Sequence, residues 1–174
     1  MRILFVCTAN TCRSPYMELA ARRLLGSTPD VAVSSAGTHG FSDRAMSQEM
    51  IGGHEAEADD FGSRRVTAGL VADADLVLTA ATAHHTFLLD EHPEAFRKVF
   101  TLGQFAEAVK NSGGTATGRE LIQVVGRRRP AADPRHDVDD PYRRGPEVAQ
   151  AVAARIDELL AIVIPALRPT QASQ

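Results

Sequence analysis

The residues with the clearest capacity for chemistry stand near the amino terminus, in the segment Cys7-Thr8-Ala9-Asn10-Thr11-Cys12-Arg13-Ser14. Cys7 and Arg13 lie on a predicted loop between an apolar, strand-like run and a helical pattern. The backbone N–H groups of such a loop can converge on one anion, and the helix that follows directs its positive end at the same point. That field also favours the thiolate form of Cys7. The segment therefore predicts a cysteine nucleophile at the base of a phosphate-binding loop.

Individual residue types in this segment suit that chemistry. Arg13 has a planar fork that can hold two oxygens of a phosphoryl group, which Lys cannot match. Ser14 can donate its hydroxyl to the sulfur of Cys7 and can also cap the following helix. Asn10 can adopt a left-handed conformation and tie the loop together through its side-chain amide. The alternative is a plain strand-to-helix turn with a buried Cys7. The remaining members of the predicted phosphate cradle are Thr8, Ala9, Thr11 and Cys12.

Composition points to an ordinary globular chain. Its 174 residues suit one domain with a full-sized core, and 44% of them are hydrophobic. The formal net charge of −3 gives no argument for binding nucleic acid or a membrane surface. The two cysteines, Cys7 and Cys12, do not form a disulfide framework, and neither a secretory signal nor a membrane span is visible. We therefore expect a cytoplasmic protein.

Strand and helix patterns alternate along the chain. The predicted strands cover residues 2–7, 31–33, 75–79 and 98–101, and the predicted helices cover residues 14–25, 82–89, 105–109 and 148–164. The predicted irregular segments are a tight polar turn at 34–38, a flexible loop at 111–118, a long proline-containing loop at 130–146 and a disordered tail at 168–174. This order predicts one domain over residues 1–167, an α/β fold in three layers with a doubly wound, four-stranded parallel sheet. The phosphate-binding loop follows the first strand, at the sheet edge where such folds bind ligands.

The loop motif resembles the signature of the low-molecular-weight protein tyrosine phosphatases, a Cys, five residues and Arg-Ser near the amino terminus. Two further features of that family occur here in the same order, a Ser-Ala-Gly-Thr turn at residues 35–38 and an Asp-Pro-aromatic sequence at residues 140–142. The resemblance covers nearly the whole chain. It implies a cysteine-dependent phosphatase that hydrolyses phosphotyrosine in proteins, needs no cofactor or metal, and binds phosphate and other oxyanions as inhibitors.

The resemblance also implies a two-step mechanism. Cys7 attacks phosphorus and forms a cysteinyl-phosphate while Asp140 protonates the leaving group, and Asp140 then deprotonates the water that releases phosphate. Arg13 and the loop amides stabilise the equatorial oxygens, and Ser35 supports the loop. Two other acids, Asp133 and Asp139, compete with Asp140 for the role of acid.

The aromatic residue after Pro141 and the nearby final helix favour Asp140 over its competitors. Asp133 also precedes a proline, but we interpret that pair as a turn.

Cys12 has two possible roles that do not exclude each other. It is a small buried filler, or, as the resemblance implies, it forms a reversible disulfide with Cys7 that protects the nucleophile.

Several positions depart from the family pattern. Ala9 stands where the family usually has Gly, and Phe61 replaces a His that supports the loop. Tyr142 is an expected pocket wall, but Arg143 follows it where the family often has a second aromatic residue. Phe41 falls where the family places another aromatic pocket wall, although it also reads as a core residue.

Three alternative functions remain beside phosphotyrosine hydrolysis. Members of the same family that act on phosphoarginine resemble this chain at Thr11, where tyrosine phosphatases commonly carry Ile, and at residues 75–78 and 98–102. Basic residues Arg143 and Arg144 at the rim would repel such a cationic substrate, so phosphotyrosine is the favoured interpretation. An arsenate reductase would need a cysteine outside the loop, which the chain lacks. An inactive phosphate-binding module would not need nucleophile, cation and acid together.

Overall fold

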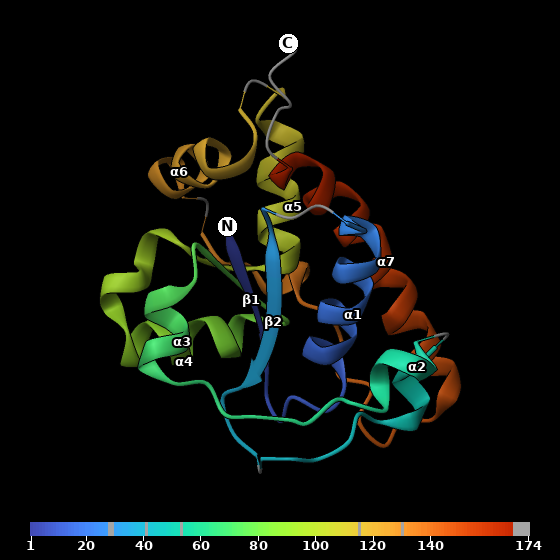
Figure 1. Cartoon of the computed structure of the whole chain (residues 1–174). Helices are drawn as coiled ribbons and strands as arrows, with labels where there is room; N and C mark the ends of the chain where they lie inside the picture. The colour runs from blue at the N-terminus through green and yellow to red at the C-terminus, as the bar shows by residue number, and fades with distance from the viewer. Residues whose placement is uncertain (28–29, 41, 53, 115, 130, 169–174) are drawn as a thin grey trace.

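The structure is a computed structural model that describes residues 1–27, 30–40, 42–52, 54–114, 116–129 and 131–168. At its centre is a four-stranded parallel sheet with the strand order β2-β1-β3-β4 (Figure 1). The predicted α/β fold with a four-stranded parallel sheet is confirmed. The strands are β1 (Arg2–Cys7), β2 (Ala32–Gly37), β3 (Leu76–Thr79) and β4 (Val99–Thr101).

Helices cover both faces of this sheet, which gives the three layers. Figure 1 shows α1 and α7 side by side on one side of the sheet, with α3 and α4 on the other. The first layer contains α1 (Arg13–Leu25), α5 (Leu102–Asn111) and α7 (Pro146–Leu167), and the second contains α3 (Ala68–Asp73) and α4 (Thr82–Glu91). The other helical segments are α2 (Glu55–Ala58), α6 (Gly118–Arg128) and the 3₁₀ turns η1 (Gln48–Met50), η2 (Pro93–Arg97) and η3 (Pro134–His136).

The apolar strands divide their side chains between the two layers. In β1, Ile3 and Phe5 pack with α1, α5 and α7, whereas Leu4 and Val6 pack with α3 and α4. All four side chains are at most 1% exposed. A parallel sheet covered on both faces requires such continuous apolar strands, and this is why the amino-terminal run ends abruptly where the polar loop begins.

The prediction of a polar turn at residues 34–38 is wrong for residues 34–37. Residues 34–37 continue β2 and pair in parallel with residues 4–7 of β1. The serines misled the prediction because they serve the neighbouring loop rather than a turn. Gly37 ends the strand so close to that loop that a Cβ there would lie 2.6 Å from the carbonyl oxygen of Thr8.

Helical structure is more extensive after β4 than the sequence predicted. α5 begins at Leu102, where Thr101 and Gln104 form a capping box, and the predicted helix covered only residues 105–109. α6 was not predicted at all. Its buried residues include Leu121, Ile122 and Val125, a short amphipathic pattern that the glycine-rich segment before it obscured.

The last helix, α7, is a little longer than predicted and contains Pro165 near its end. Its buried face packs on α1 and α5. None of the helices that the structure describes is both long and apolar enough to cross a bilayer. Of the tail predicted to be disordered, only Arg168 belongs to the described residues, so that prediction lies outside them.

Candidate active site

The thiol of Cys7 lies at the carboxyl end of β1, directly before the loop, and the residue is only 2% exposed. Its Sγ lies 3.1 Å from Oγ of Ser14. Ser14 was also predicted to cap α1, and that prediction is wrong, because α1 begins at Arg13 and Ser14 lies inside its first turn. The Ser14 hydroxyl lies between the sulfur atom and the carbonyl oxygen of Ala36, 3.3 Å away.

Asn10 organises the loop from its middle. It has the expected left-handed conformation, with φ of 56°, and its side chain is completely buried. Its Nδ2 donates to Oγ of Ser14 at 2.9 Å and to Oγ of Ser35 at 2.8 Å. Its Oδ1 accepts a hydrogen bond from the backbone N–H of Arg64 at 2.9 Å. The amide thus joins the loop to α1, to β2 and to the segment beyond.

Ser35 continues this network away from the loop. It is 2% exposed, and its hydroxyl donates to Oε2 of Glu18 at 2.6 Å. Glu18 in turn forms an ion pair with Arg22 one turn further along α1. Because Ser35 gives its proton to Glu18, it presents a lone pair to Asn10, which fixes the orientation of the Asn10 amide.

The backbone of the loop is arranged as an anion cradle. The carbonyl groups of Cys7, Thr8 and Thr11 point away and accept hydrogen bonds from residues 38, 39 and 47. Within the described part of the chain, the N–H groups of residues 8–12 donate no hydrogen bond. Successive unpaired N–H groups before a helix amino terminus form a concave site for an anion such as phosphate.

Arg13 completes the cradle and is itself 5% exposed. Its Nη1 donates to the carbonyl oxygen of Val138 at 3.1 Å, and its Nη2 lies 3.0 Å from Oδ2 of Asp140. The buried Nε has no hydrogen-bond partner among the described residues. An unpaired buried N–H of a guanidinium is costly, and an oxygen of a bound oxyanion would satisfy it.

The loop that carries Asp140 is fastened to the end of β3. Asp137 accepts hydrogen bonds from the backbone N–H and the hydroxyl of Thr82, both at 2.7 Å, and the N–H of Val138 donates to the carbonyl of Ala80 at 2.8 Å. Asp140 Oδ1 accepts from the N–H of Tyr142 at 3.2 Å, which turns Oδ2 toward Arg13. The carboxylate is thereby held over the cradle although its side chain is 55% exposed.

These groups share one pocket of about 840 Å³. Of the residues predicted from the sequence, the pocket lining contains Cys7, Thr8, Ala9, Thr11, Cys12, Arg13, Asp140 and Tyr142. Asn10, Ser14 and Ser35 stand behind it as buried supports. Phe41, the other predicted wall, lies outside the described residues. Tyr142 is 60% exposed, and the guanidinium of Arg143 lies 5.1 Å from the centre of its ring.

The competing acids are placed elsewhere. Asp133 caps η3 by accepting from the backbone N–H of Arg135 at 2.9 Å, and the Arg135 hydrogen bonds hold the pKa of Asp133 at about 2. This is the turn role expected for it. Asp139 is exposed and lies in a different surface pocket, with Arg144 and Arg155. Among the described carboxylates, Asp140 is the one in the lining of the Cys7 pocket.

Cys12 faces the same pocket and is 7% exposed. Burial raises the pKa of its thiol, although hydrogen bonds from Thr11 and Ser47 partly oppose this effect. A raised pKa keeps Cys12 protonated at neutral pH, so it does not compete with Cys7 as a nucleophile. Both cysteines are free thiols in the structure.

Sequence reasoning missed three contributors to this region. Arg44 lines the pocket, Asp137 anchors the acid loop, and His84 contacts Thr8 with its Nε2 at 2.9 Å from the hydroxyl oxygen. His84 offered one signal, since it follows β3 closely and the carboxyl ends of parallel strands meet at one sheet edge. The sequence offered no comparable signal for Arg44.

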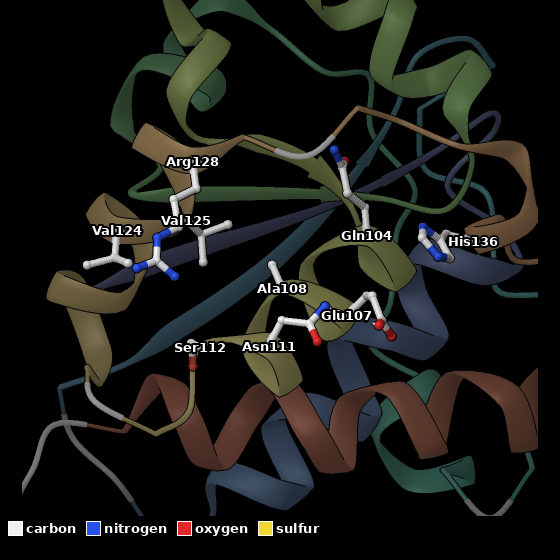
Figure 2. A pocket seen from close by; sticks show the side chains of 9 residues that line it. All are labelled: Gln104, Glu107, Ala108, Asn111, Ser112, Val124, Val125, Arg128 and His136. Atoms are coloured by element: carbon white, nitrogen blue, oxygen red, sulfur yellow. Dashed lines mark hydrogen bonds between the residues drawn. The ribbon is translucent and has the colours of Figure 1, made fainter.

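A second, smaller pocket of about 200 Å³ lies between α5 and α6. Figure 2 shows Ala108 and Asn111 of α5 on the side of Val124 and Val125 of α6, with Gln104, Glu107 and His136 toward the other end. It shares no lining residue with the Cys7 pocket. The pocket between α5 and α6 is therefore separate from the site that contains the cradle, the thiol and the carboxylate.

Comparison with known proteins agrees with this geometry. The sequence model of the low molecular weight phosphotyrosine protein phosphatase family matches residues 2–116. The chain belongs to this family. The matched range contains the phosphate loop and Ser35 but ends before Asp140, so the match gives no information on the acid. The expected family of cysteine-based phosphatases is confirmed.

Individual relatives show the same relationship. The chain is 33% identical over 108 residues to the low molecular weight protein-tyrosine-phosphatase Etp of Escherichia coli strain K12, covering 60% of this chain and 71% of Etp. It is 26% identical over 169 residues to the probable phosphatase EpsP of Ralstonia solanacearum, covering 95% of each. Among solved structures, YwlE arginine phosphatase from Geobacillus stearothermophilus superimposes with a TM-score of 0.73 at 27% identity, covering 95% of this chain and 92% of that one.

The ion pair between Arg13 and Asp140 predicts how the site responds to oxyanions. Asp140→Asn should tighten the inhibition by phosphate or vanadate about two- to fivefold, because a partly exposed ion pair is worth ~0.5–1 kcal/mol and the carboxylate repels the incoming anion. The measurement is the dissociation constant by calorimetry. Asp139→Asn, which removes the same charge from a neighbouring position outside the pocket, is the control and should change nothing. Weaker or equal binding by the Asp140 variant would contradict the arrangement.

Proposed function

We propose that this protein is a cysteine-dependent phosphatase that hydrolyses phosphotyrosine in protein substrates. The observation that carries the proposal is that Cys7 lies in one pocket with a convergent set of hydrogen-bond donors. Cys7 lines one pocket with the loop residues and Arg13, and neither the N–H groups of residues 8–12 nor Nε of Arg13 has a partner among the described residues. Together these donors match the equatorial oxygens of a phosphoryl group.

In the first step the Cys7 thiolate attacks phosphorus in line with the ester bond. The bond between phosphorus and the phenolic oxygen breaks, and Asp140 transfers its proton to that oxygen. The Ser14 hydroxyl accepts from Nδ2 of Asn10 and lies 3.3 Å from the carbonyl oxygen of Ala36, and in this step its hydrogen turns from that carbonyl to the sulfur, 3.1 Å away. The products are a cysteinyl-phosphate and a neutral phenol.

In the second step a water molecule attacks the same phosphorus atom. Asp140, now a carboxylate, takes a proton from this water while the bond between phosphorus and sulfur breaks. The thiolate of Cys7 is regenerated and phosphate leaves. Arg13 serves both steps, since its guanidinium keeps its charge and position while the phosphoryl group moves between the two oxygens and the sulfur.

Phosphoarginine is the second candidate substrate. Thr11, whose hydroxyl can accept a hydrogen bond from a guanidinium, lines the pocket, and the chain is similar to a structure named as an arginine phosphatase. Against it stand the basic residues at the mouth, Arg44 in the lining and Arg143 against the ring of Tyr142. Like charges there disfavour a cationic substrate. Phosphotyrosine is therefore the proposed class.

The reaction can be tested on a chromogenic aryl phosphate. Cys7→Ser should abolish turnover yet still bind vanadate, because the cradle remains, whereas Arg13→Ala should lose both. Asp140→Asn should slow turnover roughly 10²- to 10⁴-fold for poor leaving groups and less for nitrophenolate, which needs little protonation. Steady-state rates and vanadate binding provide the measurement. Ordinary turnover by Cys7→Ser would refute the mechanism.

The substrate class requires a direct comparison. We expect a higher kcat/KM for a phosphotyrosyl peptide than for the matched phosphoarginyl peptide. Thr11→Ile should shift the ratio further toward phosphotyrosine, since an aliphatic wall suits a phenyl ring and cannot accept a hydrogen bond from a guanidinium. An unchanged ratio in the variant would mean that position 11 does not distinguish the two leaving groups, and a ratio that favours phosphoarginine in the wild type would reverse the assignment.

A further inference from the structure

His84 belongs to the layer opposite α1 yet contacts the phosphate loop. It lies in the first turn of α4, directly after the turn that follows β3, and is 6% exposed. Its Nε2 lies 2.9 Å from Oγ1 of Thr8, the loop residue next to Cys7. Thr8 is exposed on its other side and lines the pocket above the thiol. A buried imidazole is thus joined to the wall of the active site through one hydroxyl.

The surroundings of His84 bear on which ring nitrogen carries its proton. Burial, assisted by Arg13, lowers the pKa of His84 to about 4, so the ring is neutral at neutral pH. Its Nδ1 is buried and has no hydrogen-bond partner within the described residues. A buried N–H without an acceptor is costly, because the group has lost its hydrogen bonds to water. Nδ1 is unpaired in either tautomer, but a buried N–H without a partner is rarer in proteins than a buried acceptor without one. We therefore assign the proton to Nε2, whose N–H then points at Thr8.

The tautomer determines what Thr8 offers to the pocket. When Nε2–H donates to Oγ1, one lone pair of the hydroxyl is occupied and its hydrogen remains free to donate elsewhere. A phosphate monoester bound in this pocket would offer acceptors to this hydroxyl, namely its phosphoryl oxygens and its ester oxygen. We propose that His84 is a positioning residue, which holds the Thr8 hydroxyl as a fixed hydrogen-bond donor toward the bound phosphate ester. This inference rests on the proposed function.

The neighbouring His85 provides a matched control. It lies in the same helix turn, is 8% exposed, and also has its pKa lowered by burial. Its Nε2, however, contacts Nη2 of Arg129 at 3.1 Å and faces away from the loop. The two histidines are similarly buried neighbours in α4, but only the replacement of His84 removes a contact with Thr8.

A double-mutant cycle on the aryl phosphate reaction tests the proposal. Thr8→Val and His84→Phe should each lower kcat/KM about 3- to 10-fold, the net value of one hydrogen bond, mainly through KM. The double variant should be no worse than either single variant, because His84 acts only through Thr8. His84→Gln, which restores a side-chain N–H donor, and Thr8→Ser, which restores the hydroxyl, should recover most of the loss. His85→Phe should behave like the wild type.

Other outcomes would overturn the proposal while leaving the phosphatase reaction intact. One is a Thr8→Val variant with wild-type kcat/KM. Another is a double variant in which the two losses of kcat/KM multiply. A third is a His84→Phe variant whose melting temperature falls while its KM stays unchanged. If His84→Phe does not fold, the comparison of Thr8→Val with Thr8→Ser still decides whether the hydroxyl matters. Failure of the proposed function itself would be seen separately, as a wild-type protein without turnover.

Discussion

The proposed active site depends on one constrained residue, Asn10. A non-glycine residue in the left-handed region costs of order 1 kcal/mol or more, and here three hydrogen bonds from a fully buried amide hold it in place. That conformation reverses the chain within the loop. The carbonyl groups of Cys7, Thr8 and Thr11 accept hydrogen bonds from residues 38, 39 and 47, and the N–H groups of residues 8–12 find no acceptor among the described residues. Without this constraint the segment would be an ordinary connection between a strand and a helix.

The groups to which we assign catalysis come together because β3 lies beside β1. The phosphate loop follows β1, and the turn after β3 supplies the carbonyl of Ala80 and the donors of Thr82 that fasten the acid loop. Asp140, which is more than 120 residues from Cys7 along the chain, is thereby brought over the cradle. Arg13 joins the two parts, since it contacts both the Val138 carbonyl and Asp140. A shift of the phosphate loop would therefore move or break the contacts of the Asp140 loop, and the reverse also holds.

The sequence predicted the features that depend on local chemistry. The apolar run of β1, the spacing of Cys7 and Arg13, and the left-handed preference of Asn10 each follow from neighbouring residues. The full length of β2 did not, because Ser35 is buried by partners from α1 and the loop rather than by apolar packing. Nor could local pattern reveal the ion pair of Arg13 with Asp140 or the contact of His84 with Thr8, since both join segments that only the tertiary fold places side by side.

The central claim is that Cys7 carries the phosphoryl group between substrate and water. The most direct test mixes the protein briefly with an aryl phosphate, quenches the mixture in acid, and locates the label by mass spectrometry of the digested protein. The account predicts a phosphoryl group on the sulfur of Cys7, formed and lost at rates that support turnover. A phosphoryl group on a different residue, or turnover with no phosphorylated enzyme at any time, would contradict it.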